Sequence, residues 1–187
     1  MEPVTLRTER LELSIPTAAD VDAITAACQD PEIPRWTTVP SPYARKDAEE
    51  FIALVAGWWA DGIETVWAIR RDDELAGMIG LHRITKHAHG GEAEIGYWGT
   101  AAHRGQGVMG EAGRAVVDYA FAELGLARIE WRAVVGNAPS ARTARSLGFR
   151  YEGMRRQGHA SPRGRDDGWI AGLLASDDRA PVEWPVL

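Results

Sequence analysis

A glycine-rich run could bind a charged ligand through its backbone. It reads His103-Arg104-Gly105-Gln106-Gly107-Val108-Met109-Gly110-Glu111-Ala112 and lies between an expected strand and a long amphipathic helix. Glycines permit positive φ angles and remove the Cβ atoms that would hold a ligand away. Backbone N–H groups at a helix start point outward, and the helix dipole favours an anion there. The run therefore suits a diphosphate, although a turn of this kind is also found as a plain tight connection.

Two other phosphate-binding folds do not fit this run. A Rossmann fold places G-x-G-x-x-G in its first strand-to-helix turn, whereas this run follows several strands and lacks that spacing. A Walker A loop needs G-x-x-x-x-G-K-[ST], which is absent from the sequence.

A second segment about thirty residues later makes the pattern specific. Its residues are Asn137-Ala138-Pro139-Ser140, followed by Gly148-Phe149 and Glu152-Gly153. Together the two segments resemble the acetyl-CoA-binding motifs of the GNAT acetyltransferase superfamily, Q/R-x-x-G-x-G/A and then N-x-x-S with G-F and E-G. Arg104, Gly107 and Met109 occupy the three positions of the first motif, and Met109 replaces the usual small residue, as the RimJ/RimL-like branch tolerates.

Other parts of the chain are similar to the same branch, the ribosomal-protein N-acetyltransferase type. They are the start Thr8-Glu9-Arg10-Leu11-Glu12-Leu13, the segment Glu94-Ile95-Gly96-Tyr97-Trp98 and the ending near Gly164 to Leu174. The resemblance covers nearly the whole chain. It implies a single α/β (α+β) GNAT domain over residues 1–187, with a mixed, mostly antiparallel sheet of about seven strands and about four flanking helices. It also implies a splay between the fourth and fifth strands, around Glu94 and around residues 128–135.

The resemblance further implies that acetyl-CoA is the acyl donor. Backbone amides of the glycine-rich run surround the diphosphate, Arg104 supplies a cation, Asn137 bonds the pantetheine arm, and a strand amide near Trp98 holds the oxyanion. The full set expected along the cofactor is Tyr97, Trp98, Arg104, Gly105, Gln106, Gly107, Val108, Met109, Gly110, Asn137, Ser140 and Arg142.

Two catalytic roles are expected. The Ser140 hydroxyl lies near the thioester sulfur by resemblance and can protonate the departing thiolate, or it can simply assist the helix start at Pro139. An ammonium ion must lose a proton before it can attack, and Glu94 is the first candidate for the base, with Glu92 two residues away on the same strand face.

Other side chains have weaker claims. His82, His87 and His89 offer imidazoles near a strand, but their spacing matches no metal motif, and no metal is expected. Among the eight tryptophans, Trp36 is expected to line the acceptor pocket, because it lies in a proline-containing loop after the first helix.

The elements that position these residues can be read from periodicity and turn signals. Asp72-Asp73 is expected to form a hairpin turn, 31–42 a loop, and 180–187 a short last strand or a tail. Expected strands cover 6–14, 65–70, 75–83, 92–98, 128–135, 149–157 and 168–174; expected helices cover 17 or 20 to 28, 46–59, 109–125 and 139–147.

Composition narrows the class of protein. The 187 residues carry a net charge of −6, which argues against a general nucleic-acid binder, although seven arginines between Arg142 and Arg165 are a local exception. One cysteine, Cys28, excludes an internal disulfide and suggests packing. The sequence start resembles no secretory signal and no apolar run reaches membrane-spanning length, so a cytoplasmic location without a membrane partner is expected.

The predicted reaction is acetyl transfer from acetyl-CoA to a primary amine, by direct attack in a ternary complex. The acceptor is a small amine, an amino acid or a protein N-terminus, and a homodimer is possible. Two alternatives stay open. The donor could be succinyl-CoA or another acyl-CoA, paired through Arg142, Arg163 or Arg165, or the chain could be a non-catalytic CoA-binding sensor.

Overall fold

A computed structural model describes all residues 1–187. Eight strands form one sheet in the order β1-β2-β3-β4-β5-β6-β8-β7. Every neighbouring pair is antiparallel except β5 and β6, which run parallel. The strands are β1 (Leu6–Arg7), β2 (Glu12–Ser14), β3 (Thr65–Arg71), β4 (Glu74–Thr85), β5 (Gly91–Gly99), β6 (Leu126–Val134), β7 (Arg150–Ser161) and β8 (Gly164–Leu174).

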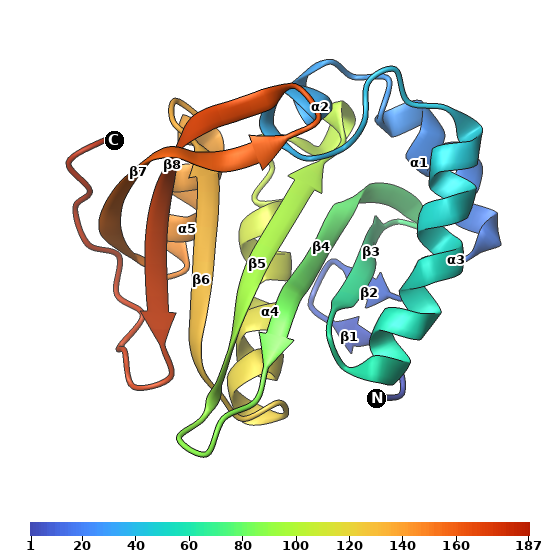
Figure 1. The fold of residues 1–187 in the computed structure, drawn as a ribbon. Coiled ribbons are helices and arrows are strands. Elements are labelled where there is room, and N and C mark those ends of the chain that lie inside the picture. The colour runs from blue at the N-terminus through green and yellow to red at the C-terminus, as the bar shows by residue number, and fades with distance from the viewer.

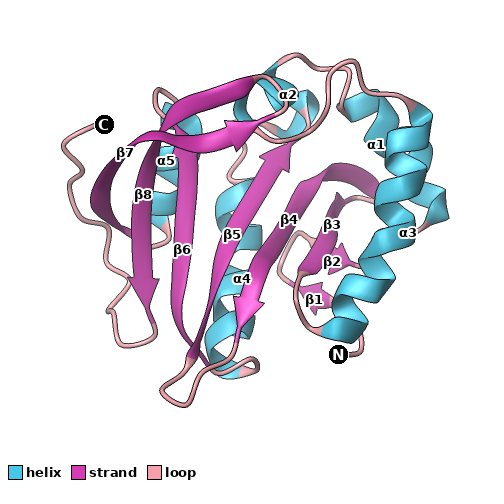
Figure 2. Cartoon of the chain, in the orientation of Figure 1, coloured by secondary structure: helices cyan, strands magenta, loops and turns pink.

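Five α-helices and two 3-10 turns accompany the sheet. The helices are α1 (Val21–Ala27), α2 (Glu32–Trp36), α3 (Arg45–Asp61), α4 (Val108–Ala122) and α5 (Ala138–Ser146), and the turns are Ala18–Asp20 and Ala101–His103. In Figure 1, α4 and α5 lie behind the sheet, and the β7–β8 hairpin arches in front of it toward α2. Figure 2 shows the strands in front of α4 and α5, with α1 and α3 beside the β1–β3 end of the sheet.

The core is a cluster of 37 buried hydrophobic residues. Alternation along the strands decides which side chains enter it. In β6, Ile129, Trp131 and Ala133 are buried, while Glu130 and Arg132 alternate with them. The Trp131 ring reaches Ser140 of α5, so Glu130 and Arg132 point away from that helix. We call the sheet face that carries Glu94, Glu130 and Arg132 the outer face.

The fold confirms the mixed, mostly antiparallel sheet, with a different element count. The expected strand over 6–14 is two short strands, because the chain turns between Thr8 and Leu11. There, the Thr8 N–H donates to the Leu11 carbonyl at 3.0 Å and the Leu11 N–H donates to Thr8 Oγ1 at 3.0 Å. These local bonds replace ladder bonds. The Asp72-Asp73 turn is confirmed, since both residues adopt positive φ between β3 and β4.

One expectation was wrong, and the bounds of two expected strands differ. The supposed loop 31–42 contains α2, whose Pro34 is tolerated because N–H groups in a first helical turn have no intrahelical partner. The strands expected over 149–157 and 168–174 are longer and form one hairpin that ends at Ser161–Gly164.

The C-terminal segment 180–187 forms no strand. Prolines at 181 and 185 lack the N–H group that a ladder needs. The segment instead buries Trp184, whose Nε1 donates to the Phe149 carbonyl at 3.0 Å. No helix is long and apolar enough to cross a membrane.

Candidate active site

The parallel pair β5 and β6 separates along its length. Their register runs from Gly91 opposite Leu126 to Ile95 opposite Trp131 and ends there. Beyond that point, residues 96–99 of β5 stay paired with β4, and residues 132–134 of β6 stay paired with β8. The edges that face each other are thus left without strand partners. An extended chain can bind such edges as an added strand. The splay was predicted, and it occurs between these two strands.

The glycine-rich run follows β5 and leads into α4. Gly105 and Gly107 adopt left-handed φ values of 73° and 76°, and Gly107 is the residue that precedes the helix. The first N–H groups of a helix have no acceptor within it. None of the N–H groups of residues 105–110 donates to a carbonyl elsewhere in the chain. This set of free donors at a helix N-terminus fits an anionic diphosphate.

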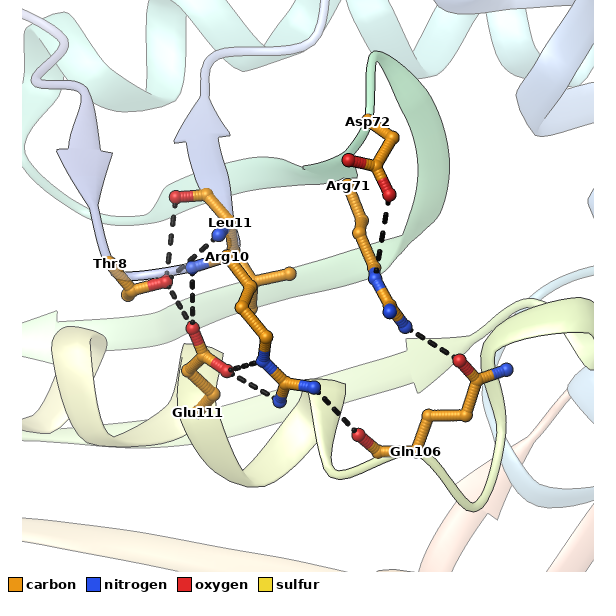
Figure 3. A network of polar contacts seen from close by, with 7 residues as sticks. All are labelled: Thr8, Arg10, Leu11, Arg71, Asp72, Gln106 and Glu111. Carbon is orange, nitrogen blue, oxygen red and sulfur yellow. Dashed lines mark hydrogen bonds and ion pairs between the residues drawn. The ribbon is translucent and has the colours of Figure 1, made fainter.

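The side chains of Arg10, Arg71 and Glu111 hold this loop in place (Figure 3). Glu111 of α4 accepts from Arg10 Nε at 2.8 Å, from the Arg10 N–H at 3.1 Å and from Thr8 Oγ1 at 2.5 Å. Arg10 Nη1 donates to the Gln106 carbonyl at 3.3 Å, and Arg71 Nη1 donates to Gln106 Oε1 at 2.6 Å. The Gln106 side chain is thereby fixed against the protein, and its backbone N–H has no acceptor in the chain.

The carboxylate in this network keeps its charge. Burial raises the pKa of Glu111, but the hydrogen bonds from Thr8 and Arg10, with the Arg10 charge, outweigh burial and leave that pKa below its usual value. Sequence reasoning did not assign Arg10, Arg71 or Glu111 to the site. The available signals were the family-like Thr8-Glu9-Arg10 start and an acidic residue in the first turn of α4.

Arg104 is bound by the protein itself. Its Nη1 lies 2.7 Å from Asp30 Oδ2, and its Nε donates to the Gly99 carbonyl at 3.1 Å. The hydrogen bond from the Glu32 N–H is the main cause that holds the pKa of Asp30 below its usual value, with Arg104 adding to it. Arg104 thus ties the loop to the segment between α1 and α2, and the Asp30 carboxylate balances its charge.

The start of α5 gathers polar groups beside the splay. Asn137 is buried and precedes the helix, and its Oδ1 accepts from the Ser140 N–H at 3.3 Å. Ser140 Oγ accepts from Trp131 Nε1 at 3.1 Å, and the Tyr97 hydroxyl donates to the Ser140 carbonyl at 2.9 Å. Burial raises the pKa of Tyr97, so its hydroxyl stays protonated. Asn137 rather than Ser140 caps the helix, which leaves the Ser140 hydroxyl proton free to be donated.

The Glu94 carboxylate is already paired. Its Oε2 contacts the Arg83 guanidinium and lies 3.5 Å from Arg132 Nε. Its side chain is only 18% exposed. Glu92 is exposed, lies opposite Arg128 in the paired part of the sheet and is farther from the splay. The structure therefore places Glu94 beside the splay and Glu92 away from it.

Trp36 lies above the splayed ends. A Cβ added to Gly136, directly after β6, would be 3.9 Å from Trp36 Cη2. Trp36 Nε1 donates to Glu32 Oε2 at 3.0 Å, and the Arg35 guanidinium lies 4.5 Å from the Trp36 ring centroid. At the hairpin tip, Arg163 Nη2 donates to the Arg35 carbonyl at 2.7 Å. The hairpin tip, α2 and the segment after β6 thus meet over the site, in an arrangement we call the roof.

The remaining cofactor candidates also lie around the glycine-rich run and the splay. Val108 is buried and Met109 half-buried, with the Met109 Cε 3.8 Å from where a Cβ of Gly99 would stand. Trp98 is half-buried in the part of β5 that is paired with β4 but not with β6. Arg142 is exposed on α5.

The three clustered histidines do not form a site. His82 Nδ1 lies 2.8 Å from Glu64 Oε2, whereas His87 and His89 are exposed in the β4–β5 loop, at the end of β5 opposite the splay. No group of three or more His, Cys, Asp or Glu side chains could hold a metal ion. Cys28 is buried, and burial raises its pKa to about 12, which fits packing.

Free amides at a helix start beside a splayed parallel strand pair fit a ligand in which a diphosphate is joined to an extended arm. The sequence comparisons identify the family. The model of the GNAT acetyltransferase domain matches residues 10–150, and the chain belongs to this family. It is an acetyl-CoA-dependent N-acetyltransferase.

Individual relatives agree with this assignment. The chain is 32% identical to an uncharacterized N-acetyltransferase of Bacillus licheniformis over 81% of this chain and 85% of that one. It is 35% identical to the ribosomal-protein-serine acetyltransferase of Escherichia coli over 51% of this chain and 52% of that one. The fold also matches Mycobacterium smegmatis RimJ in complex with CoA-disulfide, with a TM-score of 0.86 at 21% identity, over 94% of this chain and 90% of that chain.

Proposed function

We propose that this enzyme binds acetyl-CoA with its diphosphate on the amides of residues 105–110 and its pantetheine arm between β5 and β6. The free amides are the observation that carries the assignment, because six adjacent donors otherwise lack an acceptor in the chain. The exposed Arg142 supplies positive charge. The Asn137 amide group, whose Oδ1 is used by the helix cap, offers its Nδ2 to the arm.

The acyl group is transferred by direct attack of the amine in a ternary complex. A backbone amide near Trp98, in the part of β5 that is not paired with β6, holds the carbonyl oxygen as it gains charge. The Ser140 hydroxyl, fixed by Trp131, gives its proton to the sulfur as the C–S bond breaks. A base on the outer face removes the ammonium proton. Glu94 is the carboxylate predicted for this step, but its Oε2 is already paired with the guanidinium groups of Arg83 and Arg132.

The proposed acceptor is a protein N-terminus. The Escherichia coli relative is named a ribosomal-protein-serine acetyltransferase, and a serine residue offers an amine only where it begins a chain. The roof is where this acceptor would bind, because Trp36 lies next to Gly136 after β6 and the Arg163 contact joins the hairpin tip to α2 there. A cytoplasmic location is part of this proposal, since ribosomal proteins are made there.

A longer acyl donor has less support. Arg163 donates to the Arg35 carbonyl, and Arg165 Nη1 donates to the Gln157 carbonyl at 3.0 Å. Of the three arginines that could pair with the carboxylate of a succinyl group, only Arg142 makes no side-chain hydrogen bond within the protein.

Product analysis tests the proposal. Acetyl-CoA and succinyl-CoA are each offered with peptides that begin with Ser, Ala or Met, with the same peptides blocked at the N-terminus, and with free amino acids. We expect mass spectrometry to show acetylation at the α-amine of unblocked peptides only. Equal modification of blocked peptides would contradict the assigned acceptor. Double-reciprocal plots of initial rate against acetyl-CoA at several fixed peptide concentrations should give intersecting lines, as a ternary complex requires. Parallel lines would indicate a covalent acyl-enzyme.

A further inference from the structure

One histidine outside the groups assigned above lies in the β7–β8 hairpin. His159 of β7 stands opposite Asp166 of β8. Its Nε2 is buried and has no hydrogen-bond partner. Buried polar atoms are almost always paired, so an unpaired imidazole nitrogen calls for an explanation such as a role toward a ligand.

The contacts of Gly168 show where His159 lies relative to the splay. A Cβ added to Gly168 would be 3.4 Å from His159 Cβ and 3.6 Å from the Ala133 carbonyl oxygen. Gly168 of β8 is paired with Val134 of β6. Val134 lies three residues past Trp131, where the pairing of β5 with β6 ends. His159 therefore borders the splayed part of the sheet.

The side chain lies on the outer face. Val134 shares a face with Arg132, two residues earlier, and its partner Gly168 presents the same face. His159 covers the place that a Gly168 side chain would fill. Because β5 and β6 are in register up to Ile95 and Trp131, Val134 is level with Trp98. Glu94 is opposite Glu130, which puts it about 13 Å back along the strands from that level.

The charges around His159 favour a neutral ring. Burial is the main cause that lowers the pKa of His159 below its usual value, and the charges of Arg163 and Arg132 lower it further, while Asp166 acts in the opposite direction. At neutral pH the imidazole is uncharged and has a free lone pair on one nitrogen. Glu94, by contrast, already has two guanidinium partners.

We propose that His159 is the base that takes the proton from the acceptor's ammonium group, directly or through one water molecule. An N–H bond of the ammonium breaks and an N–H bond forms at Nε2. The freed amine lone pair then bonds to the acetyl carbonyl carbon, the C–S bond breaks, and the sulfur takes the proton of Ser140. The nitrogen of the new amide loses its second proton, which restores the Ser140 hydroxyl. This inference rests on the proposed function and names a residue that the reaction requires.

Kinetics of the His159→Gln variant against pH test the inference. In the wild type, kcat/KM should fall as the pH drops through the imidazole pKa, below 6.5, because the ring is then protonated. The variant should lose about 10²- to 10⁴-fold in kcat/KM and should lack that acidic limb. The dissociation constant for CoA, measured by calorimetry, should stay the same, which shows that the variant is folded. His89→Gln, in the exposed β4–β5 loop, is the matched control and should behave as the wild type.

Two results would overturn the inference. His159→Gln could keep kcat/KM within about threefold with its acidic limb intact, or Glu94→Gln could remove that limb while His159→Gln does not. A wild type that binds CoA but acetylates no amine would instead contradict the proposed function, so the two failures are distinguishable.

Discussion

Ser140 has hydrogen-bond partners that define what its hydroxyl can do. Trp131 Nε1 donates to Ser140 Oγ, so the oxygen is fixed as an acceptor and its own proton remains available. We expect Ser140→Ala to lower kcat by about 10²-fold, because the departing thiolate loses its proton donor. CoA affinity should change less than about threefold, since the diphosphate is held elsewhere.

Thr143→Ala is the control for Ser140→Ala. Thr143 lies in the same helix and its Oγ1 donates to the Pro139 carbonyl at 3.2 Å. It should keep full activity in the same steady-state assay. A Ser140→Ala enzyme with unchanged kcat would show that the hydroxyl serves only the packing of Trp131.

Gly107 is required by its backbone conformation. Its φ of 76° is left-handed, and an alanine there costs about 1–2 kcal/mol. Relaxation of this strain would reorient the free amides of residues 105–110 that are proposed to bind the diphosphate. We expect Gly107→Ala to weaken CoA binding by at least about tenfold in calorimetry.

Gly57→Ala is the matched control for this loop substitution. Gly57 lies within α3 at an ordinary helical φ, and an added Cβ meets nothing within 4 Å. Alanine is the better helix former, so this variant should be as stable as the wild type or more stable. Unchanged CoA affinity in Gly107→Ala would mean that the loop amides do not hold the diphosphate.

At the scale of elements, Glu111 joins α4 to the turn between β1 and β2. Hydrogen bonds to a charged group contribute about 1.5–3 kcal/mol when well buried, and Arg10 is 40% exposed, so we expect Glu111→Gln to lose about 1–2 kcal/mol of unfolding free energy at pH 7. The pKa of Glu111 is lowered in the folded state. Its contribution is therefore complete above the unfolded value of about 4.5 and is lost as the pH falls through the lower folded value.

Urea unfolding at pH 7 and at pH 3 measures this contribution. The difference between wild type and Glu111→Gln should shrink at the lower pH. Glu49→Gln, whose partner Arg45 is also more than half exposed, should lose less than about 0.5 kcal/mol at either pH. A Glu111→Gln difference that is independent of pH would contradict a charged carboxylate in the network.

The roof joins α2, the β7–β8 hairpin and the segment after β6. Removing the Trp36 ring should raise KM for a peptide acceptor by about two- to tenfold, the equivalent of one aromatic contact, and leave the CoA dissociation constant unchanged. Trp36→Phe keeps a ring and should recover most of the affinity. Equal loss of CoA and acceptor affinity in Trp36→Ala would assign the tryptophan to the fold rather than to the acceptor.

For the whole molecule, backbone features could be predicted and many side-chain partners could not. Periodicity and the two glycine-containing motifs were enough to place α4 and α5, because these depend on local sequence, and the resemblance to the GNAT superfamily implied the splay of β5 from β6. The pairing of Glu94 with Arg83 and Arg132 joins three strands, and the position of His159 depends on how far the hairpin extends. Such contacts depend on strand register, which could not be read from the sequence alone. The helix α2 was missed because Pro34 within it and Pro31 directly before it indicate a loop, although the first turn of a helix tolerates proline.

The measurement that most directly tests the account is thiol release from acetyl-CoA with N-terminal peptides and amines, comparing the wild type with Asn137→Ala and Ser140→Ala. We predict release that an amine stimulates and that both substitutions suppress, with one acetyl group on the amine for each thiol released. A wild type that fails to bind CoA, or that binds it and gives no amine-stimulated release, would contradict the central claim that this chain is an acetyl-CoA-dependent N-acetyltransferase.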